Sequence, residues 1–149
     1  MTDTKKYFHL LSYIQYPILL VVTYYYGLFI FSIAKLNPDW NQLNNALIYL
    51  GIQIGFSTLQ DTNKTQNNFS KRIWENPKKG NIAIFCILFM VAFFLIFGLV
   101  GFFKSQENIH KEISFGLIIL GISLIGLLKA AIEMFENHRK DKNPSSSNV

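Results

Sequence analysis

Four apolar stretches make up most of this chain of 149 residues, and together they limit the folds open to it. They cover residues 7–34, 43–59, 82–103 and 113–135. A helix needs about 20 mainly apolar residues to cross a hydrocarbon core about 30 Å thick. Because lipid offers no hydrogen-bond partner to a backbone, such segments cross as helices. We therefore predict an all-α integral membrane protein, a four-helix bundle of four transmembrane helices.

Composition leaves little room for anything besides these spans. Half of the residues are hydrophobic, and the segments between the apolar stretches are short. We expect one membrane domain over residues 1–135, with an inner loop at 61–81 and a cytoplasmic tail at 136–149. Within the first span, Pro17 lacks the N–H that a helix would use and is expected to kink it.

Lysine and arginine are unevenly divided between the two ends of the predicted spans. If the N-terminus is cytoplasmic, ten lie inside (Lys5, Lys6, Lys64, Lys71, Arg72, Lys78, Lys79, Arg139, Lys140, Lys142) and three outside (Lys35, Lys104, Lys111). Cytoplasmic segments carry such an excess. We predict that both termini are cytoplasmic and that the protein resides in a cytoplasmic (plasma) membrane. The net charge of +5 is scattered over loops, which argues against a nucleic-acid partner.

The second span is the least hydrophobic and has one polar face. At about 100° per residue, five polar side chains fall within a sector of about 120°. They are Asn45, Tyr49, Gln53, Ser57 and Gln60. An amide in hydrocarbon without a partner costs several kcal/mol, so this sector must face other helices or water. We predict that it lines a pore or the interior of the bundle.

Two glycines of the second span lie outside that polar sector. Gly51 and Gly55 are one turn apart, and small residues at this spacing permit close helix approach in membranes. We expect both glycines to serve helix packing.

The inner loop 61–81 combines basic and aromatic residues. Because no Gly or Pro precedes Pro77, we expect the helix of the second span to continue into this loop. Basic residues beside an interfacial tryptophan suit an anionic leaflet or a protein partner, and they are also routine in inner loops. The residues expected to make this contact are Lys71, Arg72, Trp74, Lys78 and Lys79.

One acid–base pair, Lys129 and Glu133, lies within a span, in the last two turns of the fourth. Ionisable groups inside a membrane are candidates for a functional site, but long side chains near a helix end can reach the interface. We predict either an interfacial pair or the lining of an inner vestibule.

Sequence patterns of catalysis and metal binding are missing. His9, His110 and His138 fall at three separate span ends, so they are not expected to meet at a metal, and Cys86 is the single cysteine. The chain has no HExxH motif and no glycine-rich phosphate loop. We expect no enzymatic activity, no cofactor and no metal site.

Two functions fit these features. The first is a homo-oligomeric pore or conduit lined by the polar face of the second span, which requires self-association in the lipid bilayer. The alternative is a non-conducting interaction or sensing subunit that uses the basic inner loop 61–81 to bind anionic lipid or a protein.

The orientation can be checked by cysteine labelling in intact cells, with Cys86 replaced by serine. A cysteine at Asn68 should react with a membrane-impermeant maleimide only after permeabilisation, because the positive-inside rule places this loop in the cytoplasm. A cysteine at Gln106, in the short loop between the third and fourth spans, should react without permeabilisation. Reaction at position 68 in intact cells would contradict the orientation.

Overall fold

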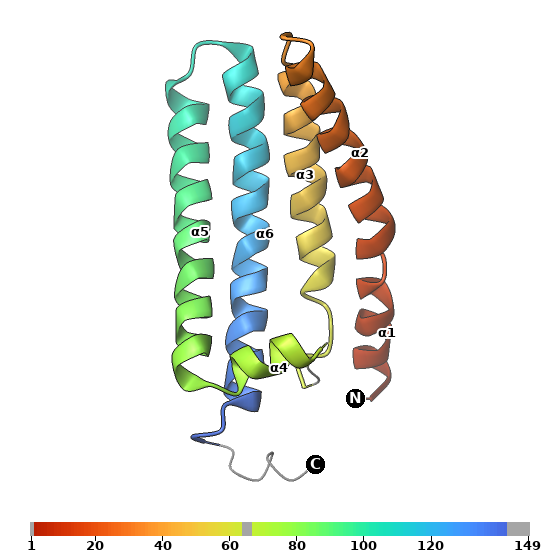
Figure 1. Cartoon of the computed structure of the whole chain (residues 1–149), viewed down its shortest axis with the longest axis vertical. Coiled ribbons are helices and arrows are strands. Elements are labelled where there is room, and N and C mark those ends of the chain that lie inside the picture. The colour runs from red at the N-terminus through yellow and green to blue at the C-terminus, as the bar shows by residue number, and fades with distance from the viewer. Residues whose placement is uncertain (1, 64–66, 143–149) are drawn as a thin grey trace.

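The computed structural model describes residues 2–63 and 67–142, and within these the chain is helical without a strand. The helices are α1 (Thr2–Ser12), α2 (Gln15–Ala34), α3 (Trp40–Ser57), α4 (Asn68–Trp74), α5 (Pro77–Lys104) and α6 (Asn108–His138). Figure 1 shows α5, α6, α3 and α2 upright beside one another, with α1 below α2 and the short α4 across the lower end. The all-α prediction is therefore confirmed.

Three helical segments are long and apolar enough to cross a membrane. Among the described residues these are Lys6–Ala34, Pro77–Lys104 and Asn108–His138. The exception among the long helices is α3, whose Asn and Gln residues lower its hydropathy. A fourth span at α3 and the cytoplasmic position of both termini remain predictions.

The long helices pack in the order α5, α6, α3 and α2. Helix α6 lies between α5 and α3 and contacts both extensively, while α2 packs on α3. Val91 of α5 and Leu120 and Leu124 of α6 form a buried cluster, against which residues of α3 also pack, among them Leu50 and Ile54. Helices α3, α5 and α6 therefore share one core, with α2 on the outer side of α3.

Glycines of α6 and α5 permit this packing. A Cβ atom added at Gly116 would lie 2.6 Å from Oδ1 of Asn44 on α3. One added at Gly98 of α5 would lie 2.8 Å from a side-chain carbon of Ile118 and 3.0 Å from its backbone nitrogen. Real Cβ atoms essentially never approach within 3.0 Å, so a side chain at either position would require the neighbouring atoms to shift.

The first predicted span is broken at Tyr13 and Ile14, one turn before Pro17. Pro17 has no N–H for the carbonyl of Tyr13, which instead accepts a bond of 3.1 Å from the N–H of Tyr16. The proline thus acts on the turn that precedes it, and α1 and α2 become separate helices.

The prediction that the helix of the second span continues into the loop is wrong, since α3 ends at Ser57. The hydroxyls of Ser57 and Thr58 donate to carbonyls of α3 at 2.7 Å, which competes with continuation of the helix. A new helix, α4, begins where Oδ1 of Asn67 accepts the N–H of Ser70 at 2.7 Å. The loop therefore turns and presents α4 as a separate element.

Gly51 and Gly55 differ in their surroundings although they lie one turn apart on α3. A Cβ atom at Gly51 would lie 2.9 Å from Cγ2 of Ile119 on α6 and 3.3 Å from the backbone of that residue. A Cβ atom at Gly55 would meet nothing within 4 Å. Only Gly51 therefore lies at the α3–α6 contact.

This difference gives a matched pair of substitutions. Gly51→Ala should lower the free energy of unfolding by about 1–3 kcal/mol, because the added methyl forces α3 and α6 apart. Gly55→Ala should be neutral or stabilising by up to about 1 kcal/mol, because alanine favours helix over glycine. Unfolding of the detergent-solubilised protein measures both, and equal effects would contradict the assigned helix contact.

Candidate functional site

The polar face of α3 meets α2 at its centre. The ring of Tyr49 stacks on Tyr25 of α2, with ring centroids 5.4 Å apart and an angle of 7° between the planes. Further along α2 towards α1, Gln15 is 7 % exposed, and α1 in turn contacts α3. Part of the predicted lining therefore lies against another helix of the same chain.

The remaining predicted lining residues have different environments. The Ser57 hydroxyl donates to the carbonyl of Ile54 within α3, so its hydrogen-bonding capacity is used locally. Asn45 and Gln53 are half-buried, and neither side chain has a hydrogen-bond partner among the described residues. Gln60 lies beyond the end of α3, where its N–H donates to the carbonyl of Ser57.

A small cavity lies where α1, the end of α3 and α6 meet. It has a volume of about 230 Å³. Its lining residues are Phe8, Thr58, Leu59, Gln60, Asp61, Thr62, Asn63 and Glu133. Glu133 lies 3.8 Å from Nζ of Lys129, and both side chains are exposed, Lys129 to 79 % and Glu133 to 49 %. The predicted acid–base pair is therefore accessible on the surface of α6, and its carboxylate also borders this cavity.

Basic side chains cluster on α4 and on the first turn of α5. We call the set Lys71, Arg72, Lys78 and Lys79 the cationic end of the molecule. All four residues are exposed, and they lie with α4 at the end of the molecule where α5 begins and α6 ends (Figure 1). Phe69 of α4 is 72 % exposed, so an apolar ring stands on the surface of the same helix.

Contacts of Ser70 and Trp74 hold α4 against α6. The indole N–H of Trp74 donates to Oγ of Ser70 at 2.9 Å, and that hydroxyl contacts the sulfur of Met134 on α6 at 3.8 Å. The tryptophan predicted to face lipid or a partner is thus half-buried and serves in part to position α4. The basic residues are the more accessible members of the predicted contact set.

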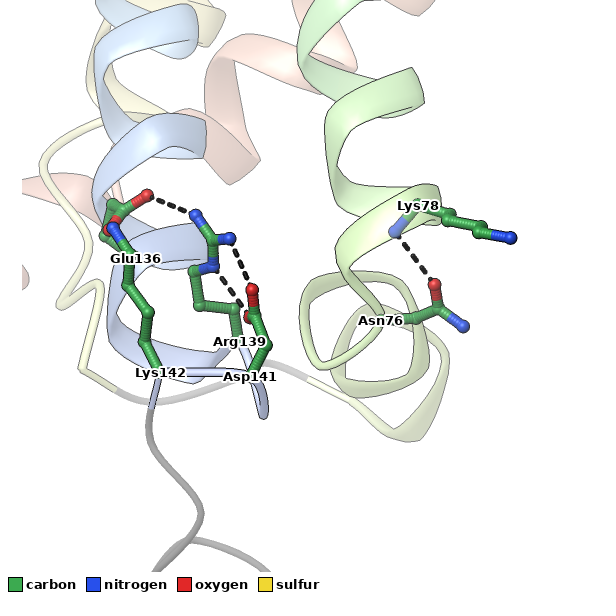
Figure 2. A network of polar contacts seen from close by, with 6 residues as sticks. All are labelled: Asn76, Lys78, Glu136, Arg139, Asp141 and Lys142. Atoms are coloured by element: carbon green, nitrogen blue, oxygen red, sulfur yellow. Dashed lines mark hydrogen bonds and ion pairs between the residues drawn. The ribbon is translucent and has the colours of Figure 1, made fainter.

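Carboxylates near the cationic end are paired with cations that follow α6. Arg139 donates to Glu136 at 3.0 Å and to both oxygens of Asp141, and Lys142 donates to Glu136 (Figure 2). The hydrogen bond from Arg139 lowers the pKa of Asp141. Lys140 contacts Glu75 at 2.9 Å, and this bond lowers the pKa of Glu75. These acids therefore stay ionised and engaged at neutral pH.

Three cations of the cationic end are left without an acidic partner in the described part of the chain: Arg72, Lys78 and Lys79. The fourth, Lys71, lies 3.8 Å from Glu75. Asn76 fixes the backbone beneath two of the unpaired cations. Its Oδ1 accepts the N–H of Lys78 at 3.0 Å (Figure 2) and the N–H of Lys79 at 3.2 Å. Pro77 then opens α5, as is usual for the first turn of a helix.

A second cavity opens beside this helix start. Its volume is about 400 Å³, and it is lined by Arg72, Glu75, Asn76, Pro77, Lys79 and Lys140. The lining comes from α4, from the start of α5 and from the segment after α6. Three cations face one carboxylate here, so the cavity is suited to an anion.

Glu75, Asn76 and Lys140 were missed by the sequence predictions. The Asn-Pro pair is a helix-start signal that reveals the capping role of Asn76. No local signal reveals Lys140, because its contact with Glu75 joins segments that only the complete fold brings together.

No group of three or more His, Cys, Asp and Glu side chains within residues 2–63 and 67–142 is arranged to hold a metal ion. Comparison of the chain with protein-family models, with curated proteins and with solved structures finds no match.

The exposure of Lys129 and Glu133 yields a prediction about their pairing. Joint replacement, Lys129→Met with Glu133→Gln, should change the free energy of unfolding by no more than about 1 kcal/mol, because exposed ion pairs contribute roughly 0–1 kcal/mol. Unfolding in detergent measures this, with each single substitution as a control. A loss well above 1 kcal/mol would indicate that the pair is structurally essential.

Proposed function

We propose that this chain is an integral membrane protein of four spans, with both termini cytoplasmic, that acts as a non-conducting interaction subunit at the inner leaflet. In this proposal the cationic end binds anionic lipid headgroups. The observation that carries it is the charge arrangement: Arg72, Lys78 and Lys79 are exposed and unpaired among the described residues, whereas the nearby acids are engaged.

The shape of this end supports a membrane-surface role. Helix α4 lies across the end of the upright helices (Figure 1), and the exposed Phe69 gives it an apolar anchor. A short helix with basic residues and an aromatic ring suits the boundary between headgroups and acyl chains. Each basic residue near an anionic surface contributes about 1 kcal/mol of attraction.

The packing of α3 favours the interaction subunit over a conduit formed by one copy. Tyr49 stacks on Tyr25, so α2 covers the middle of the polar sector. A lumen lined by this sector would require α2 to lie elsewhere. In this arrangement the polar residues of α3 contact neighbouring helices, because polar side chains in lipid need such partners.

A homo-oligomeric conduit lined by α3 is the second candidate, and the environments of Asn45 and Gln53 favour it. Both side chains are half-buried and lack a hydrogen-bond partner in the described chain. An amide left in hydrocarbon costs several kcal/mol, so a water-filled lumen or a second copy would relieve that cost. For this function, several copies of the chain would associate through α3.

The lipid proposal is tested by titrating the detergent-solubilised full chain with phosphatidylserine and measuring bound lipid by native mass spectrometry. Neutralising Arg72, Lys78 and Lys79 together to Gln should weaken binding about 100-fold, at about 1 kcal/mol per basic residue. Binding of zwitterionic phosphatidylcholine should not change. Neutralising Lys35, Lys104 and Lys111, three cations near the opposite end, is the matched control and should leave phosphatidylserine binding intact. Equal binding by both variants would refute the proposal.

The conduit is tested by ion flux in liposomes that contain the purified protein. If α3 lines a lumen, Gln53→Leu should lower the flux several-fold, because it removes a polar group from the path. Ile52→Leu, at an exposed apolar position of the same helix, is the control and should leave the flux unchanged. Absence of flux through the wild-type protein would exclude the conduit.

A further inference from the structure

The 400 Å³ cavity beside α4 has the features of a site for one particular class of headgroup. Its volume falls within the range of about 300–1,000 Å³ that is typical of small-molecule sites. Arg72 reaches it from α4, Lys79 from the first turn of α5, and Lys140 from the segment after α6. Cations from three separate segments thus border a single space.

The charge of the lining is set by the Glu75–Lys140 pair. Lys140 holds the Glu75 carboxylate at 2.9 Å, so this acid is engaged. Arg72 and Lys79 have no acidic partner in the described part of the chain. Three cations against one carboxylate leave two positive charges. A phosphate monoester carries between about 1.5 and 2 negative charges at neutral pH and offers three acceptor oxygens.

The surface of α5 above the cavity indicates whether such a phosphate belongs to a lipid or to a soluble compound. Ile82, Phe89 and Phe93 recur at helical spacing on the side of α5 that lies between Lys78 and Lys79, and all three are exposed. This apolar stripe begins within one turn of Lys79. A headgroup bound at Lys79 would therefore leave acyl chains lying along α5.

We propose that this cavity is a binding site for the phosphomonoester headgroup of an anionic lipid, with Arg72 and Lys79 as its recognition residues. The assignment rests on the proposed lipid-binding function and adds a preference to it. Arg72 offers a planar fork of N–H donors to phosphate oxygens, and Lys79 offers a point charge. The site would select phosphatidic acid over phosphatidylserine, whose phosphate is a diester.

The sequence provides a matched control in Lys78. It neighbours Lys79, is likewise exposed and unpaired within the described chain, and shares the Asn76 cap, but it does not line the cavity. Lys78→Gln and Lys79→Gln therefore remove the same charge at the same end of the protein. Only the second removes it from the site.

The experiment measures the affinity of the full chain for phosphatidic acid and for phosphatidylserine by native mass spectrometry in one detergent. The wild type should prefer phosphatidic acid about tenfold, and Lys79→Gln or Arg72→Gln should abolish most of that preference. Lys78→Gln should lower both affinities, by up to about fivefold, and keep the preference.

Three other results would overturn the headgroup site, the lipid-binding function or the choice of a lipid as the ligand. A preference lost equally in Lys78→Gln and Lys79→Gln, or no preference in the wild type, would overturn the headgroup site while leaving general lipid binding in place. Absence of binding to either lipid would refute the proposed function itself. In a further arm, inorganic phosphate at millimolar concentration should not displace phosphatidic acid, and displacement would assign the cavity to a soluble phosphate.

Discussion

The close approach of α6 to α3 and α5 is the interaction on which the other features depend. Between helices in lipid there is no hydrophobic driving force, so association depends on close packing and on hydrogen bonds. Gly116 and Gly98 remove the side chains that would separate the backbones, and the Leu120–Leu124 cluster fills the space that remains. Helix α3, which is less apolar than the three candidate spans, thereby becomes a central element of the fold.

Placing α3 against α6 determines where its polar residues go. Gly51 faces α6, so the polar sector on the other side of α3 meets α2, as the stacking of Tyr49 on Tyr25 shows. Polar residues near the break between α1 and α2 are also shielded, since Ser12 is 1 % and Gln15 7 % exposed. Part of the polar surface of α3 is thus accommodated within one chain, while the side chains of Asn45 and Gln53 have no hydrogen-bond partner among the described residues.

Features that depend on local sequence could be predicted from the sequence alone. Apolar length predicted the all-helical fold and the three most apolar segments, and small residues at helical spacing pointed to Gly51. The same spacing could not distinguish Gly51 from Gly55, because the difference lies in which side of α3 meets α6. The end of α3 was missed for another reason. Its hydroxyl-to-carbonyl bonds at Ser57 and Thr58 compete with a helix that no Gly or Pro interrupts.

The segment after α6, residues 139–142, controls the charge of the cationic end. Glu75 directly follows α4, the helix that carries Arg72, and it is the one carboxylate that lines the cavity. Lys140 engages Glu75, and Arg139 engages Glu136 and Asp141. Cations that follow α6 are therefore used within the protein, while Arg72, Lys78 and Lys79 have no acidic partner among the described residues. One partner of each ion pair is half-buried, Glu75 at 17 % and Arg139 at 18 % exposure, and the other partner is exposed. Their consequence is the charge that α4 presents at the end of the molecule, and this makes the segment after α6 part of the proposed site.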